Sequence, residues 1–358
     1  MSRRRQETAD PREAVAQWFD LQGIGCRALG SAFYGELCTR MAADARAGGA
    51  VYDALREHAS EPFERVYQLR LLGGIHRIVL EGRAPDLARH YPTVGGDGDV
   101  DAVWPRILAL IARRPPEIAD ALTHPVQTNE VARSTALVGG FLTVARDTRL
   151  PLRVLELGAS AGLNLRFDHY RYEQDGTAFG PADSPVRFSG RWPDAVPPFD
   201  APLEVVERAG CDRDPIDPTT EDGRVALLSY TWPGQEERLE LLRHALDVAR
   251  RVAAPVARAD LVEWLDEQLA EIRRGTATVV FHSIVWQYLP DPARASVRSL
   301  LARAGARATA DAPLAWLRLE PRPPSLGTPE LRLTRWPGGE ERLLATASFH
   351  TGPVHWRG

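Results

Sequence analysis

Apolar residues recur every three or four positions through the first part of the chain, which is the period of an amphipathic helix. Asp10-Pro11 is typical of a helix start, and Gly48-Gly49 is typical of a helix end. No segment here alternates with the period of a strand. The pattern predicts an all-α domain over residues 1–125, with helices from 11 to between 23 and 30, then over 31–48, 61–79 and 103–112.

From Thr128 the pattern changes. A long helix to about residue 148 leads into a strand at 152–157 that is apolar on both faces, as in the centre of a parallel sheet. Strands that alternate with helices predict an α/β sheet with crossovers, so residues 126–358 are expected to form an α/β domain. The further strands are expected at 203–206, 255–257, 278–284, 314–319, 331–335 and 343–349, and the helices at 235–252, 260–274 and 292–304.

Two connections depart from this alternation. The segment 336–340, Trp-Pro-Gly-Gly-Glu, is too short for a helix, so the last two strands are expected to pair as a C-terminal antiparallel hairpin. The connection after the first strand is longer than a crossover helix needs. Within it, His169–Tyr172 followed by Asp175-Gly176 predicts a hairpin insertion near 165–200.

Composition excludes several reaction classes. All 44 basic side chains are arginine, because the 358 residues include no lysine. A lysine Schiff base, a lysyl intermediate and a Walker-A phosphate loop are therefore excluded. The net charge of −4 argues weakly against broad electrostatic capture of nucleic acid.

Neither a membrane anchor nor a metal site is indicated. No apolar run approaches the roughly 18 to 20 residues of a spanning helix, and the first ten residues do not look like a signal peptide. Cys26, Cys38 and Cys211 lack the spacing of a metal site or a redox pair, so we expect packed thiols in a cytoplasmic protein. The oligomeric state is left open.

The segment from Val154 to Asn164 is the best candidate for a site. A buried strand is expected to end at Gly158, a tight turn follows, and a helix is expected to begin at Gly162. Backbone N–H groups at a helix start can hold a polar or anionic ligand, and ligands of open α/β sheets bind at the carboxyl ends of the strands. A strand-turn-helix with no ligand would give the same pattern.

Two known motifs compete for this segment. The spacing of Gly158 and Gly162 does not fit the dinucleotide fingerprint. Gly158, Ser160 and Gly162 do match the G-x-S-x-G elbow of serine hydrolases, with Ser160 as nucleophile and His350 or His355 as base. That elbow needs several strands before it, whereas the preceding residues look helical.

A third interpretation covers more of the chain. Glu156, Gly158 and Gly162, with Ser160 at the middle glycine, are followed by Gly210-Cys211-Asp212, by Ala259-Asp260-Leu261 and by a Leu-Pro-Asp run at 289–291. In this order the segments resemble the class I S-adenosylmethionine-dependent methyltransferases, a Rossmann-like fold that also has a C-terminal antiparallel hairpin. The resemblance extends from Thr128 onward, and each motif alone is weak.

The resemblance implies specific roles. S-adenosylmethionine would be the cofactor, with Asp212 at its ribose, Asp260 and Leu261 near its adenine, and Asn164 or Arg133 near its amino-acid end. His282 would be the catalytic base, and His282-Ser283 in place of an Asn/Asp-Pro-Pro motif argues against methylation of base amines. The residues expected to bind the cofactor are Glu156, Gly158, Ala159, Ser160, Gly162, Asn164, Asp212, Asp260, Leu261 and Ser283.

The segments 156–172, 210–212 and 232–235 also resemble an uncharacterised bacterial family with no assigned activity.

Three hypotheses remain open. The first hypothesis is a methyltransferase that acts on a small molecule, with the helical domain as a lid or substrate domain. The second is a serine hydrolase that uses Ser160, and the third is a non-catalytic homologue that binds the cofactor. The methyltransferase hypothesis expects Glu156, Asp212 and His282 to line one pocket.

Overall fold

The computed structural model describes residues 10–271, 273–322, 327–350 and 352–358. The chain divides into two compact units. The first comprises Met1–Thr128 together with Glu221–Glu240, and the second comprises Asn129–Thr220 and Leu241–Gly358. The fold is mixed α/β. The segment Glu221–Glu240, which was expected within the α/β domain, belongs to the first unit.

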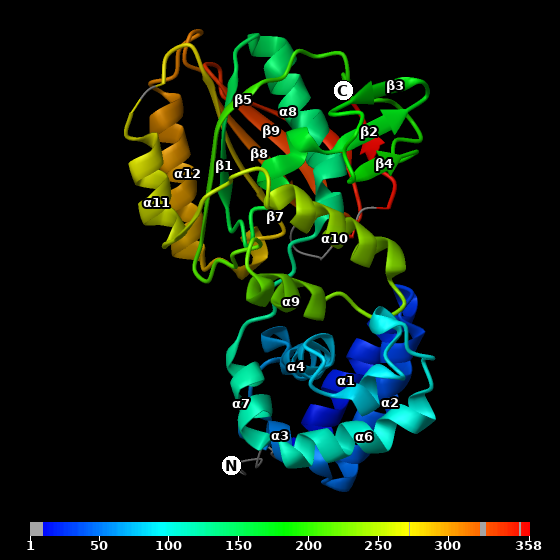
Figure 1. Ribbon diagram of the computed structural model, residues 1–358. Helices are drawn as coiled ribbons and strands as arrows, with labels where there is room; N and C mark the ends of the chain where they lie inside the picture. Colours follow the sequence, from blue (N-terminus) through cyan, green and yellow to red (C-terminus); the bar gives the residue numbers. More distant parts are fainter. Residues whose placement is uncertain (1–9, 272, 323–326, 351) are drawn as a thin grey trace, which may run out of the picture. The chain divides into compact units, whose positions relative to one another are not determined.

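The described part of the first unit is helical (Figure 1). The helix expected from residue 61 begins instead at Tyr67, because Val66 takes the left-handed conformation with φ 51° and separates a short 3₁₀ turn from the helix. The elements are α1 Pro11–Ala28, α2 Ala32–Ala47, α3 Ala50–Leu55, α4 Tyr67–Leu80, α5 Pro85–Ala88, α6 Val100–Arg113, α7 Pro115–Thr123, α9 Glu221–Ser229 and the 3₁₀ turns η1 Arg56–His58, η2 Phe63–Arg65 and η3 Pro92–Val94.

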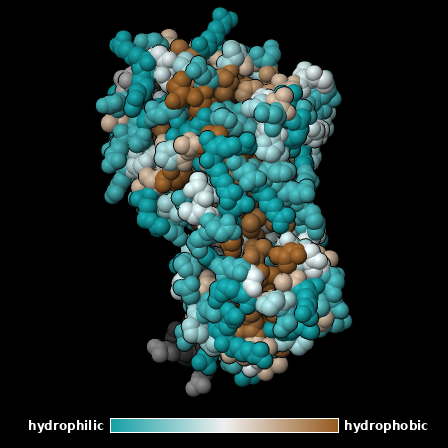
Figure 2. Space-filling view, viewed as in Figure 1, coloured by the Kyte–Doolittle hydropathy of each residue, from teal (hydrophilic) through white to brown (hydrophobic). Residues whose placement is uncertain are grey.

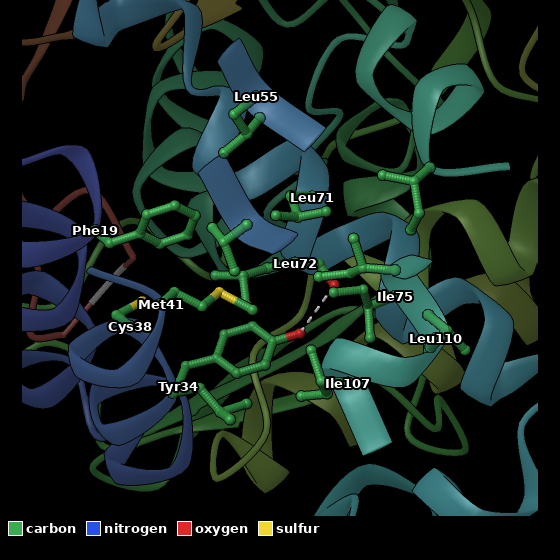
Figure 3. Close-up of a cluster of buried hydrophobic side chains, with 14 of the residues drawn as sticks. Phe19, Tyr34, Cys38, Met41, Leu55, Leu71, Leu72, Ile75, Ile107 and Leu110 are labelled. Atoms are coloured by element: carbon green, nitrogen blue, oxygen red, sulfur yellow. Dashed lines mark hydrogen bonds between the residues drawn. The ribbon is translucent and has the colours of Figure 1, made fainter. Parts of the chain in front are cut away.

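The core of this unit joins helices that are distant in sequence. Figure 3 shows Phe19 of α1, Tyr34 and Met41 of α2, and Leu71 and Ile75 of α4 packed together. All five side chains are buried. The burial of such apolar side chains stabilises the unit at roughly 25 cal/mol per Å² removed from water.

The second unit is built on an eight-stranded sheet in the order β11-β10-β9-β8-β7-β1-β5-β6. The five strands from β8 to β6 are parallel, and β9, β10 and β11 are antiparallel to their neighbours, so the expected C-terminal hairpin is present. The strands are β1 Leu152–Leu157, β5 Val205–Asp212, β6 Val256–Arg258, β7 Ala277–Ser283, β8 Leu314–Glu320, β9 Glu330–Trp336, β10 Glu340–Thr346 and β11 His355–Trp356.

Helices cover both faces of this sheet (Figure 1). Phe141 of α8 packs against Phe281 of β7, with ring centres 5.0 Å apart, on what we name the α8 face. Val280 and Trp316 share an apolar cluster with α11 and α12 on the other side, the α12 face. The remaining elements of this unit are η4 Val131–Arg133, α8 Ser134–Thr148, η5 Asn164–His169, α10 Glu236–Ala249, α11 Leu261–Leu269, η6 Trp286–Tyr288 and α12 Asp291–Gly305, and α10 begins in the first unit.

The insertion near 165–200 is a small sheet in the order β3-β2-β4. The expected hairpin is present as β2 Arg171–Gln174 and β3 Thr177–Phe179, and β4 Arg187–Ser189 adds a parallel strand. A helix was expected from Gly162, and the chain forms the 3₁₀-helix η5 over Asn164–His169. Within it Arg166 leaves the helical conformation, with φ −104° and ψ 16°.

The visible surface of both units is largely hydrophilic, with apolar residues in scattered patches (Figure 2). Within the described ranges, no helix is both long and apolar enough to cross a bilayer. All three cysteines are buried and free of disulfides.

Candidate functional site

The order of the parallel strands marks a place for a ligand. From β1 the chain adds β5 and β6 on one side, then returns to add β7 and β8 on the other. In open α/β sheets, ligands bind outside the carboxyl ends of the strands at such a reversal. The candidate site is therefore the sheet edge after β1, β5, β7 and β8.

The loop 158–163, which follows β1, is shaped by positive backbone angles and close packing. Gly158, Ser160 and Gly162 have φ values of 68°, 53° and 66°. A Cβ on Gly158 would lie 2.7 Å from Val285 Cγ2, and a Cβ on Gly162 would lie 3.0 Å from Val256 Cγ2. Both glycines are thus required by conformation and by neighbouring side chains.

Most N–H groups of this loop already have partners inside the protein. Gly158 and Ala159 donate to the Cys211 carbonyl at 2.9 and 3.0 Å, and Leu163 donates to Asn129 Oδ1 at 2.8 Å. Gly162 donates to the Ala159 carbonyl at 2.7 Å. The expectation that backbone N–H groups at a helix start hold a polar or anionic ligand stays a prediction, and a ligand would have to bind where these four N–H groups already have partners.

Asp212 joins the loop to the neighbouring strand. The backbone N–H of Ser160 donates to Asp212 Oδ2 at 2.8 Å, and that of Asp214 donates to Oδ1 at 3.0 Å. Asp212 is half-buried at the end of β5. Each carboxylate oxygen has two acceptor positions, so Asp212 can still accept hydrogen bonds from a ligand.

Glu156 lies on the α8 face and is 2% exposed. Burial raises the pKa of its carboxyl group well above the ordinary 4.5; Arg133 and Arg166 oppose this shift, and the negative charge of Asp212 adds to it. Glu156 Oε2 has no hydrogen-bond partner among the described residues. A buried carboxyl group with a raised pKa and an open acceptor is typical of functional sites.

Asn164 is the second buried group with an open acceptor. Its side chain is fully buried, its Nδ2 donates to the Glu130 carbonyl at 3.3 Å, and its Oδ1 has no partner in the described part of the chain. Arg133 lies three residues after Glu130 in the chain, and its side chain is half-buried. It donates to the carbonyls of Ser283 at 3.1 Å and of Phe349 at 3.4 Å, so Ser283 is also at this site.

The segment 129–133 was missed by sequence reasoning as a unit. It supplies Asn129 to the loop, Glu130 to Asn164 and Arg133 to the end of β7. Its sequence signal was a polar run, Gln127 to Glu130, directly before an apolar helix. Such a run also suits an ordinary helix start, so it did not single out a site.

The side chains of Asp260 and Leu261, at the start of α11, have different surroundings. Asp260 caps the helix by accepting from the Val262 N–H at 2.9 Å, and it pairs with Arg213 at 3.4 Å. Leu261 packs into the apolar cluster of the α12 face. Asp260 therefore lies at the sheet edge, whereas Leu261 is turned into the core.

His282 lies on the α12 face, because it alternates with Phe281 and stacks on Trp286 with ring centres 5.1 Å apart. Its Nδ1 is 2.7 Å from Glu320 Oε1, which also accepts from the N–H groups of Val285 and Trp286. His282 Nε2 is buried without a partner among the described residues. Glu320 was missed, because nothing in the sequence pairs β8 with this histidine.

The structure does not bring the three expected residues into one group. Glu156 and Asp212 lie on the α8 face, and His282 lies on the α12 face. The candidate bases of the hydrolase hypothesis each face a carboxylate: His350 Nδ1 is 3.3 Å from Glu130, and His355 Nδ1 is 2.6 Å from Asp194. In the described ranges, no three His, Cys, Asp or Glu side chains form a group that could hold a metal ion.

Comparison with known proteins identifies a family. The family model described as "Uncharacterized protein conserved in bacteria (DUF2332)" matches residues 16–356, which includes both units. Neither the curated proteins nor the solved structures contain a match to this chain.

Proposed function

The chain belongs to this uncharacterised bacterial family, and we propose that it is an S-adenosylmethionine-dependent methyltransferase that acts on a small molecule. The observation that carries the proposal is the hydrogen bond from Ser160 N–H to Asp212 Oδ2 at 2.8 Å. It joins the glycine loop after β1 to an acid after the adjacent strand β5. This is the juxtaposition that the methyltransferase resemblance requires of two segments far apart in sequence.

The strand order supports the same proposal. Counted along the chain, the parallel strands have the spatial order 3-2-1-4-5, with antiparallel strands beyond the fifth. Doubly wound nucleotide-binding sheets begin with the same order. Asp212 keeps acceptor positions for two ribose hydroxyl groups beside the bonds it makes to Ser160 and Asp214.

The buried acceptors fit the other end of the cofactor. Glu156 Oε2 and Asn164 Oδ1 lack partners among the described residues, and both lie beside the glycine loop. The ammonium group of S-adenosylmethionine would donate to both oxygens. An ionic donor is favoured there, because an unsatisfied buried acceptor costs about 1 to 3 kcal/mol.

When bound, S-adenosylmethionine supplies a methyl group on a positively charged sulfur. Transfer of that group is an in-line displacement, so the main task of the protein is to align the acceptor with the methyl carbon. The rigid sheet edge, with its loop held by Cys211, Asn129 and Asp212, provides a fixed platform for that alignment.

Titration calorimetry with S-adenosylmethionine and with its demethylated product tests the proposal. We expect binding of both, and a loss of about ten- to hundredfold in affinity for Asp212→Asn, which replaces one carboxylate acceptor. Asp217→Asn is the matched control, because its carboxylate accepts from the N–H and the hydroxyl of Thr219 within its own turn. No heat of binding to the folded wild-type protein would exclude the proposal. Binding without turnover on any small-molecule extract would support the non-catalytic homologue instead.

One observation favours the serine hydrolase as a second candidate. Ser160 is a non-glycine residue at φ 53°, and strained conformations of this kind are frequent at nucleophiles. Labelling by a fluorophosphonate probe that disappears in Ser160→Ala and persists in Ser283→Ala would support it. Absence of labelling in the wild-type protein would remove it.

A further inference from the structure

The α12 face carries a second group of buried polar atoms without partners. His282 Nε2 and Trp316 Nε1 are buried and have no hydrogen-bond partner among the described residues, and Glu320 Oε2 is in the same state. His282 is 1% exposed and Trp316 is 8% exposed. Their ring centres lie 5.9 Å apart. Buried polar atoms normally find partners, so three in one cluster indicate something absent from the chain itself.

The neighbouring hydrogen bonds determine whether each of the two ring nitrogens can donate or accept. Glu320 Oε1 accepts from the backbone N–H groups of Val285 at 2.9 Å and Trp286 at 3.2 Å, and His282 Nδ1 approaches the same oxygen at 2.7 Å. Because Oε1 is already an acceptor for two amides, the hydrogen of the imidazole lies on Nδ1. His282 Nε2 therefore presents a lone pair, whereas the indole nitrogen of Trp316 can only donate.

Packing keeps these atoms oriented. Trp286 stacks on His282, and the Arg298 guanidinium lies over the Trp286 ring, 5.1 Å from its centre. Arg318 lies 3.9 Å from the Trp316 ring centre. The indole rings of Trp286 and Trp316 are therefore each in contact with an arginine cation. These positive charges favour a ligand atom that carries partial negative charge.

We propose that one hydroxyl group of a small organic ligand occupies this place, donating its hydrogen to His282 Nε2 and accepting from Trp316 Nε1–H. A hydroxyl group is the simplest group that is donor and acceptor at one atom, so it satisfies both orphaned nitrogens at once. His282 then accepts the hydrogen of the ligand's hydroxyl group, and Glu320 is the positioning residue that holds the histidine tautomer.

The site can be tested without cofactor by NMR of protein labelled with ¹⁵N-histidine. The probes are three alcohols or phenols and their methyl ethers: phenol and anisole, cyclohexanol and methoxycyclohexane, 2-phenylethanol and its methyl ether. We expect His282 to show the Nδ1–H tautomer. We also expect at least one hydroxyl probe to shift its Nε2 signal with about tenfold higher affinity than the matched ether.

Two variants separate the roles. Trp316→Phe keeps an aromatic ring and should weaken the binding of the hydroxyl probe and of its ether by a similar factor of about ten, because both oxygens accept from the indole N–H. The preference for hydroxyl over ether should persist, because it depends on donation to His282 Nε2. Glu320→Gln should give a mixture of His282 tautomers, whereas Glu330→Gln, a β9 residue paired with Arg332, should leave the tautomer unchanged. If no hydroxyl probe exceeds its ether in the wild-type protein, the inference is overturned, because a trapped water or plain packing would then explain the orphaned nitrogens. Failure of cofactor binding would leave these spectra unaffected, so the two proposals fail separately.

Discussion

Two buried histidines, one in each unit, share three features: burial, an aromatic stacking partner and an acceptor at Nδ1. His76 of α4 is 0% exposed and stacks on Tyr91, with ring centres 5.5 Å apart. His282 of β7 is 1% exposed and stacks on Trp286. In both, Nδ1 faces an acceptor, the Ser229 carbonyl at 3.0 Å or Glu320 Oε1 at 2.7 Å.

The difference lies at the other ring nitrogen. Because the Ser229 carbonyl can only accept, His76 carries its hydrogen on Nδ1, and its Nε2 accepts from the Thr93 hydroxyl at 2.7 Å. His282 has the same tautomer with Nε2 open. A histidine with both nitrogens satisfied by the fold is structural. One whose lone pair is held open by a carboxylate is suited to accept a proton from a ligand.

The largest expected effect is the acid sensitivity of the His76 region. Burial lowers the pKa of His76 from 6.5 to about 4, against the hydrogen bond to Ser229, which raises it. Between these values the unfolded chain binds more protons than the folded one, so stability falls as pH falls from 6.5 to 4. The loss is on the order of 3 kcal/mol.

Hydrogen exchange of α4 amides, followed by mass spectrometry from pH 6.5 to 4, measures this loss locally, since two units can open separately. His76→Gln cannot titrate and serves as the reference. The difference in opening free energy between the two proteins should shrink steadily toward pH 4. A constant difference over this range would mean that His76 is already charged or exposed in the folded unit.

A smaller effect is expected when His76 is made to resemble His282. Thr93→Val is close in shape and removes the hydrogen-bond donor to Nε2, so the lone pair becomes a buried acceptor without its partner. We expect a destabilisation of about 1 to 2 kcal/mol by the same exchange measurement. Thr143→Val, measured by exchange at the α8 amides, is the control, because among the described residues that hydroxyl donates to the Gly139 carbonyl within its own helix. Equal costs for the two variants would show that Thr93 is not an essential partner.

Sequence reasoning was accurate where apolar burial alone determines an element. The strand at 152–157 was predicted with its observed bounds, because every residue of β1 is buried. The strand expected at 203–206 instead runs over Val205–Asp212, and it includes the charged residues Glu207 and Arg208 in its middle. Arg208 pairs with Asp168 and Glu207 pairs with Arg153, and no local pattern reveals such distant partners.

The sequence predicted which segments contribute to the candidate site. It did not predict which of their side chains lie on the same face of the sheet. The motifs named Asp212 and the glycine loop, and in the structure the two are joined by the Ser160 N–H at the ends of β5 and β1. They did not show that neighbours such as His282 and Ser283 point to opposite faces, nor which helices cover each face. Glu320 and segment 129–133 entered the site only through tertiary contacts, which sequence spacing does not record.

The smallest effect compares the two histidines directly. An asparagine at either position can keep an N–H toward the acceptor at Nδ1 and lacks an equivalent of Nε2. Both variants lose ring volume and one aromatic stack, so these costs largely cancel in the difference between them. What remains is the Thr93 hydroxyl, which loses its acceptor in His76→Asn, whereas His282→Asn removes an atom without a partner. We expect His76→Asn to cost about 1 kcal/mol more than His282→Asn in local opening free energy, measured by exchange at α4 and β7. Equal costs, or a larger cost at His282, would mean that its Nε2 already has a partner inside the fold, and the distinction between the structural and the proton-accepting histidine would then disappear.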